Sequence, residues 1–183
     1  MSNQVKLILL DADVISHFMA CSEIIYLPKI LDPHPVVIFD AVYNEVARIS
    51  SRKLILDNLL KSVRNIFRKP FPIENLEIKK EYALIKRNHP LIGDGERTCM
   101  AVAKFTKDVI ASSNFRDIVP YCKANNILYL GTLDLLVIAM KKNIFDEERC
   151  NQFIATAKAK NNARFPAGVV KITDYNAPDL SFI

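Results

Sequence analysis

The sequence predicts an α/β fold in which a mostly parallel sheet is covered by helices on both faces. The first observation is a set of short apolar runs, each bounded by polar residues, at 5–10, 36–39, 109–111 and 127–130. The second is that a helix-like segment follows each run, which gives a strand-helix alternation. Strands joined in this way lie parallel, because each helical crossover returns the chain across one face of the sheet.

Helical spacing marks the segments between these strands. After the second strand, Val42 and Val46 repeat on one helix face, and Asp40 stands at the N-cap position. The helical pattern then continues over residues 52–68, with Phe67 on the inward side, until two prolines stop it. Further helices are predicted at 77–88, from 94 onward, at 117–124, at 132–142 and at 147–159.

The composition indicates a single cytoplasmic domain over residues 1–183. Half of the residues are hydrophobic, which is enough for one well-covered core. Four scattered cysteines without a Cys-x-x-Cys pair favour buried thiols in a reducing compartment. The first apolar run continues directly into Asp11, as a strand does, and charged residues interrupt the longer apolar stretches, so we expect neither a signal peptide nor a membrane partner. A net charge of +5 favours a polyanionic partner.

Acidic residues from separated parts of the chain fall where parallel strands end. Asp11 follows the first strand, Glu45 lies one turn into the helix after the second strand, and Asp94 opens a later helix. Asn114 and Asp117 follow a further strand. Because the carboxyl ends of parallel strands meet at one edge of the sheet, we expect these side chains to lie together.

Grouped carboxylates raise each other's pKa unless a divalent cation lies between them. Oxygen ligands without a convergent His or Cys suit Mg²⁺ or Mn²⁺, which can activate a water toward a phosphodiester. The sequence leaves open whether one metal ion or two would bind. Taken singly, Asp94 also fits a helix cap and Glu45 a solvated helix residue, so the joint placement carries this interpretation.

Four segments, at 9–15, 44–46, 93–96 and 131–136, resemble in order the motifs of the PIN-domain nucleases. The similarity covers about 5–142, which leaves a C-terminal extension at about 143–183 in which 169–173 could add an edge strand. The resemblance implies a Rossmann-like three-layer α/β/α sandwich. It also implies an Mg²⁺- or Mn²⁺-dependent endoribonuclease that acts on RNA, like the toxins of bacterial toxin-antitoxin pairs. An antitoxin protein and a second copy of the chain are the partners that such a resemblance implies.

The resemblance assigns Asp11, Glu45 and Asp94 to the first three acids of that family, and Glu96 to an additional acid two residues later. Thr132 belongs to a short Gly-Thr motif with a supporting role.

The sequence departs from the family at the fourth acid. Where many members have Asp directly after the strand, this chain has Ser113 and Asn114, with Asp117 three residues further on. Residues three apart share a helix face, so Asn114 and Asp117 are both candidate metal ligands. We expect a minor role for Ser113, and a role for Asp13 in capping or orienting the turn after the first strand.

The middle third of the chain is strongly basic, and we expect its side chains either to guide an RNA backbone or to form a solvated helix face. The candidate RNA-binding residues are Lys61, Arg64, Arg68, Lys79, Lys80 and Arg87.

Two other functions compete with the nuclease. Asp11 and Asp13 after an apolar strand also resemble the motif of haloacid dehalogenase-like phosphatases, in which the first Asp is a nucleophile. That motif needs a hydroxyl residue after a second strand, and Phe39-Asp40 lacks it. The other alternative is a PIN fold that binds RNA or protein without cleaving.

Overall fold

The computed structural model describes residues 5–183 as a three-layer α/β sandwich around an all-parallel sheet, which confirms the predicted fold class. The strands, in the spatial order β3-β2-β1-β4-β5, are β1 (Ile8–Leu10), β2 (Val36–Phe39), β3 (Ile66–Lys69), β4 (Val109–Ala111) and β5 (Tyr129–Leu130). The helices are α1 (Ala12–Ala20), α2 (Leu27–Leu31), α3 (Asp40–Val46), α4 (Ser50–Ser62), α5 (Leu76–Asn88), α6 (Asp94–Thr106), α7 (Phe115–Asn125), α8 (Thr132–Lys141) and α9 (Glu147–Asn161), with 3-10 turns η1 (Ile24–Tyr26) and η2 (Ile172–Asp174).

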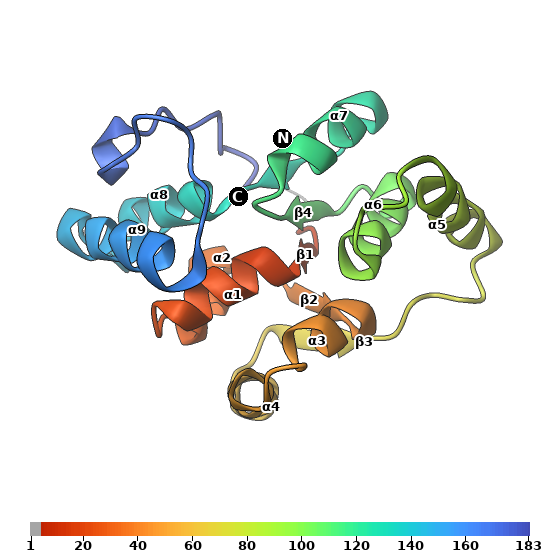
Figure 1. Cartoon of the computed structure of the whole chain (residues 1–183), viewed down its shortest axis with the longest axis horizontal. Helices are drawn as coiled ribbons and strands as arrows, with labels where there is room; N and C mark the ends of the chain where they lie inside the picture. The colour runs from red at the N-terminus through yellow and green to blue at the C-terminus, as the bar shows by residue number, and fades with distance from the viewer. Residues whose placement is uncertain (1–4) are drawn as a thin grey trace.

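The helices form two layers on either side of the sheet. Figure 1 shows α1, α2, α8 and α9 on one face and α5, α6 and α7 on the other. Every residue of β1, β2 and β4 is buried, as expected for parallel strands that are covered on both faces. None of the helices within residues 5–183 is both long and apolar enough to cross a membrane.

The order in which the chain adds strands to the sheet reverses beside β1. The chain moves outward from β1 through β2 to β3, then returns across the opposite face and enters β4 on the other side of β1. The connections that follow β1 and β4 therefore diverge and leave a crevice at the carboxyl edge of the sheet. Asp11 follows β1 and Ser112 follows β4, so both lie at this crevice.

The expected helix over 52–68 is wrong at its C-terminal end. Helix α4 stops at Ser62, and Asn65 adopts a left-handed conformation with a φ of 67°. Residues 66–69 then pair with the free edge of β2 as the edge strand β3. Ile66 is buried there, whereas Phe67, which we expected to face inward, is 48% exposed.

Residues 169–173 do not form the expected edge strand. The segment instead ends in η2, where the carboxylate of Asp174 accepts hydrogen bonds from the backbone N–H groups of Val170 and Lys171. Ile172 and Leu180 are buried against the core, so the C-terminal extension packs onto the domain through side chains.

Asp40 does not cap a helix as expected. It is the first residue of α3, after the N-cap position at Phe39, and its carboxylate accepts a hydrogen bond from Arg68 at 2.6 Å. The ion pair joins α3 to the edge strand β3.

Candidate functional site

Asp11 is fixed at the crevice by its own turn and by the neighbouring strand. Its Oδ1 accepts a hydrogen bond from the backbone of Ala12 at 2.8 Å, and its Oδ2 accepts one from Ser112 Oγ at 2.9 Å. Burial, and secondly the negative charge of Asp13, raise the pKa of Asp11 to about 7, because the two hydrogen bonds offset only part of the desolvation. This carboxyl group therefore changes charge near neutral pH.

Glu96 is a second buried carboxyl group at the same edge. It lies in the first turn of α6, and its Oε2 accepts a hydrogen bond from Asn114 Nδ2 at 3.1 Å. Its Oε1 is buried without a hydrogen-bond partner in the part of the chain that the structure describes. Burial, and secondly the charge of Asp11, raise the pKa of Glu96 to about 8. A buried oxygen without a partner lowers the stability of the protein unless something else binds it.

Asn114 connects two of these carboxyl groups. Its side-chain amide nitrogen donates to Asp117 Oδ2 at 2.8 Å as well as to Glu96, and its backbone N–H donates to Ser112 Oγ at 3.1 Å. The donor is therefore shared between two acids that would otherwise repel each other. The structure brings Asn114 and Asp117 together at the site, as the sequence predicts, and it places the nitrogen of the amide toward the acids.

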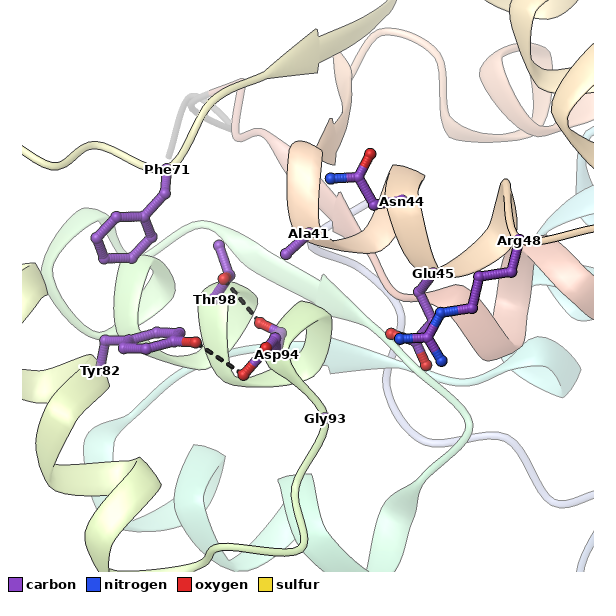
Figure 2. Close-up of a pocket in the computed structure, with 9 residues that line it drawn as sticks. All are labelled: Ala41, Asn44, Glu45, Arg48, Phe71, Tyr82, Gly93, Asp94 and Thr98. Atoms are coloured by element: carbon purple, nitrogen blue, oxygen red, sulfur yellow. Dashed lines mark hydrogen bonds between the residues drawn. The ribbon is translucent and has the colours of Figure 1, made fainter.

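Glu45 and Asp94 lie in an adjoining open cleft of about 650 Å³. The cleft is lined by Ala41, Asn44, Glu45, Arg48, Phe71, Tyr82, Gly93, Asp94 and Thr98. Figure 2 shows the Glu45 side chain extending from α3 toward the turn at Gly93, while the Asp94 carboxylate points toward Tyr82.

The two acids of the cleft have opposite pKa shifts. Partial desolvation raises the pKa of Glu45; the charge of Arg48 opposes this shift, whereas the charge of Asp94 adds to it. A hydrogen bond from Tyr82 Oη, at 2.8 Å, and the charge of Arg97 lower the pKa of Asp94. At neutral pH, Asp94 is therefore a fixed negative charge and Glu45 is the more basic group.

Sequence reasoning missed Arg97. Its guanidinium is almost completely buried, and it forms an ion pair with Asp94 and a hydrogen bond with the backbone carbonyl of Ile92. Its spacing of three residues from Asp94 on α6 is the signal that could have identified it. Arg97 fixes the direction of the Asp94 carboxylate and offsets its charge.

His17 was also missed. A chain of hydrogen-bonded side chains runs from the half-buried Ser113 Oγ to Thr132 Oγ1 at 2.7 Å, and from Thr132 Oγ1 to the buried His17 Nδ1 at 2.9 Å. Burial lowers the pKa of His17, and the charge of Asp13 opposes this effect. Thr132 and Ser113 both belong to this hydrogen-bonded chain. Asp13 does not cap α1 as expected: the N-cap is Asp11, and Asp13 is an exposed residue in the first turn of the helix.

The acids form one negatively charged region, but not a closed metal site. Glu96 is influenced by the charges of Asp11 and Asp117, and Glu45 by those of Asp13 and Asp94. Among residues 5–183, however, no three His, Cys, Asp or Glu side chains are arranged as ligands of one ion.

The six candidate RNA-binding residues lie on different parts of the domain. Arg64 precedes β3 and so lies at the edge of the sheet opposite to the acids, where it lines a separate pocket with Asp32. Arg68 is engaged with Asp40 and lies 3.7 Å above the ring of Tyr43. The remaining four are exposed, with Lys61 on α4 and Lys79, Lys80 and Arg87 on α5.

Comparisons with protein-family models, with curated proteins and with solved structures find no match to this chain. The assignment of a function therefore depends on the chemistry of the site.

Gly95 allows α6 to approach α3 closely. A Cβ at this position would lie 2.8 Å from Val42 Cγ2 and 3.2 Å from Val42 Cα. We expect Gly95→Ala to lower the free energy of unfolding by about 1–3 kcal/mol, measured by urea denaturation, because the helices must separate. Gly93→Ala is the matched control, since among residues 5–183 its Cβ would meet only the Glu45 carboxylate, at 3.8 and 3.9 Å. An equal loss in both variants would contradict this explanation.

Proposed function

We propose that the protein is a metal-dependent endoribonuclease that hydrolyses RNA phosphodiesters with Mg²⁺ or Mn²⁺ held by its carboxylates. The observation that carries the proposal is the pair of buried acids Asp11 and Glu96: the charge of Asp11 raises the pKa of Glu96, and Glu96 Oε1 is buried without a partner within residues 5–183. Such an arrangement destabilises the protein by itself, and a divalent cation would remove the repulsion. Both acids are buried and Asp11 directly follows a strand, so the pair differs from an acidic surface that is exposed to water.

The donor set fits a hard cation. Asp11, Glu96 and Asp117 offer carboxylate oxygens, and Asn114 offers an amide oxygen after a half-turn of its side chain, so Mg²⁺ or Mn²⁺ is favoured over zinc. When bound, such an ion lowers the pKa of a coordinated water and offsets charge on a phosphate. Asp94 is already paired with Arg97 and Tyr82, so we assign to it the role of a fixed negative charge that affects the neighbouring acids. Asp94 would bind a metal ion directly only if RNA or the ion displaced these two partners.

Glu45 is the best placed general base. It is exposed in the cleft, and its raised pKa makes it a better proton acceptor than an ordinary carboxylate at neutral pH. Arg48 lines the same cleft, where its positive charge can attract a phosphate (Figure 2). An RNA strand in the cleft would thus meet the general base Glu45 and the positive charge of Arg48 beside the buried acids.

The phosphatase alternative has no support beyond the first strand. Its motif needs a hydroxyl residue after a second strand, and Phe39-Asp40 lacks it. The carboxylate of Asp40 is instead paired with Arg68 of β3. The sequence resemblance to PIN-domain nucleases supports RNA as the substrate, with an antitoxin and a second copy as the partners that it implies.

The test is single-turnover cleavage of end-labelled mixed-sequence RNA by the purified protein. We expect cleavage with Mg²⁺ or Mn²⁺, loss of cleavage in EDTA, and recovery when Mn²⁺ is added in excess. A parallel assay with p-nitrophenyl phosphate examines the phosphatase alternative. Folded protein that binds RNA without metal-dependent cleavage would show a binding module instead of an enzyme.

Asp117 and Asn114 should respond differently to substitution. We expect Asp117→Asn to slow cleavage by roughly 10–100-fold, because a carboxylate beside Glu96 is lost. Asn114→Asp should keep activity and lower the Mn²⁺ concentration needed for half-maximal rate, while it lowers the metal-free melting temperature through added repulsion. Cleavage rates are measured against Mn²⁺ concentration. A wild-type metal dependence with a lower melting temperature in Asp117→Asn would mean that Asp117 only stabilises the start of α7.

A further inference from the structure

A second pocket, of about 460 Å³, opens where α7 and α8 begin and where the C-terminal extension crosses them. It is lined by Ser113, Asn114, Phe115, Arg116, Asp117, Thr132, Leu133, Arg164, Phe165 and Pro166. Its volume lies in the range of pockets that hold small ligands, and it is separate from the cleft of Figure 2.

The pocket adjoins the buried acids. Asn114 and Asp117 line its wall, and the amide nitrogen of Asn114 is hydrogen-bonded to Glu96 at 3.1 Å. A ligand in the pocket would therefore lie directly beside the carboxylates to which we assign phosphodiester hydrolysis.

The lining combines positive charge with an aromatic ring. Arg116 and Arg164 are exposed at the pocket, and a guanidinium pairs with a phosphate through two parallel hydrogen bonds. Phe165 is half-buried, and aromatic rings of this kind stack with the bases of single-stranded nucleic acids. The amino termini of α7 and α8 add partial positive charge. Asp117 Oδ1 lies 3.6 Å from Arg116 Nε, so this carboxylate offsets part of the charge of Arg116.

Two neighbouring side chains contact the ring of Phe165. The ring of Phe165 makes an edge contact with His17, with centroids 5.9 Å apart, and the ammonium of Lys158 lies 5.9 Å from its centre. The buried hydroxyl of Thr132 is fixed by the same histidine. A rigid ring and fixed hydroxyls reduce the entropy that a ligand loses on binding.

We propose that this pocket binds one nucleotide of the RNA strand next to the cleaved phosphodiester. The base stacks on Phe165, and the flanking phosphate pairs with Arg116 and Arg164. The position of this nucleotide in the strand rests on the proposed function, whereas the affinity of the pocket for a nucleotide does not.

The test compares the affinity of a short single-stranded RNA for the full chain and its variants, measured by fluorescence anisotropy in EDTA so that no cleavage occurs. We expect Phe165→Leu to weaken binding about tenfold, and Phe165→Tyr to bind like the wild type because it retains the ring. Arg164→Gln should weaken binding and reduce the slope of log affinity against log salt by about 0.7. Lys29→Gln, in the pocket beside Asp32 at the opposite edge of the sheet, is the control that also removes one exposed positive charge, and it should leave the slope unchanged.

Each outcome decides a separate question. Equal RNA affinity of Phe165→Leu, Arg164→Gln and wild type would overturn the proposal, even in a protein that cleaves RNA. If wild type never cleaves RNA but Phe165→Leu weakens RNA binding, the nuclease assignment fails and the pocket stands. The affinities of AMP and UMP for the same protein are measured in parallel. Free nucleotides that bind more tightly than the RNA would overturn the assignment of the pocket to an RNA strand.

Discussion

Replacement of Asp11 by asparagine is expected to reduce RNA cleavage by roughly a thousandfold, a loss of about 4 kcal/mol of transition-state stabilisation. Asparagine retains the shape and the hydrogen bond from Ala12 but removes the charge that would hold a cation. Because Asp11 is buried with its pKa raised to about 7, removal of the charge also relieves repulsion in the metal-free protein. We therefore expect the melting temperature of the variant in EDTA to rise while activity is lost.

Asp108→Asn is the control for this prediction. Asp108 is also buried, but it precedes β4 at the opposite edge of the sheet, where its Oδ1 accepts a hydrogen bond from the backbone N–H of Leu7 at 3.0 Å. This variant should lose some stability and keep its cleavage rate. Undiminished cleavage by a properly folded Asp11→Asn protein would remove the central claim about the site.

The stability of the metal-free protein should fall as the pH rises from about 4 to about 8. Asp11 and Glu96 have pKa values of about 7 and 8 in the folded chain, above their ordinary values of 3.8 and 4.5. Between these limits the folded state binds more protons than the unfolded state, so their contribution is complete below pH 4 and is lost as pH passes the folded pKa values. The slope is about 1.4 kcal/mol per pH unit for each extra proton bound.

Urea denaturation of wild type and Glu96→Gln in EDTA, at several pH values, isolates this contribution. The variant should show a shallower decline, because it lacks one of the two groups whose pKa is raised. Mn²⁺ should stabilise the wild type more at pH 8 than at pH 6, since the cation competes with protons for the same oxygens. Parallel pH profiles of wild type and variant would contradict the assigned electrostatics.

Much of the fold is determined by local sequence. The buried strands at 36–39 and 109–111 were predicted with the bounds that the structure shows, because continuous apolar runs leave few alternatives. The edge strand β3 was not predicted, because its apolar residues continue the helical spacing of α4. Pairing with the free edge of β2 decides its conformation, and that edge exists only in the folded sheet.

The same distinction holds for the site. The sequence by itself predicted that Asp11, Asp94 and Asp117 belong to one edge, since each follows a strand or opens a helix, whereas Glu96 was added only by the family resemblance. Only the tertiary structure decided what each acid contacts: Asn114 is shared between Glu96 and Asp117, and a buried Arg97 holds Asp94.

The second pocket depends on tertiary structure still more strongly. Phe165 and Arg164 join Thr132 and Asn114 only after the C-terminal extension has packed across α7 and α8. Local patterns report secondary structure and strand ends, because these depend on neighbouring residues. The direction of a side chain and its partners depend on packing between distant segments, which no local pattern contains.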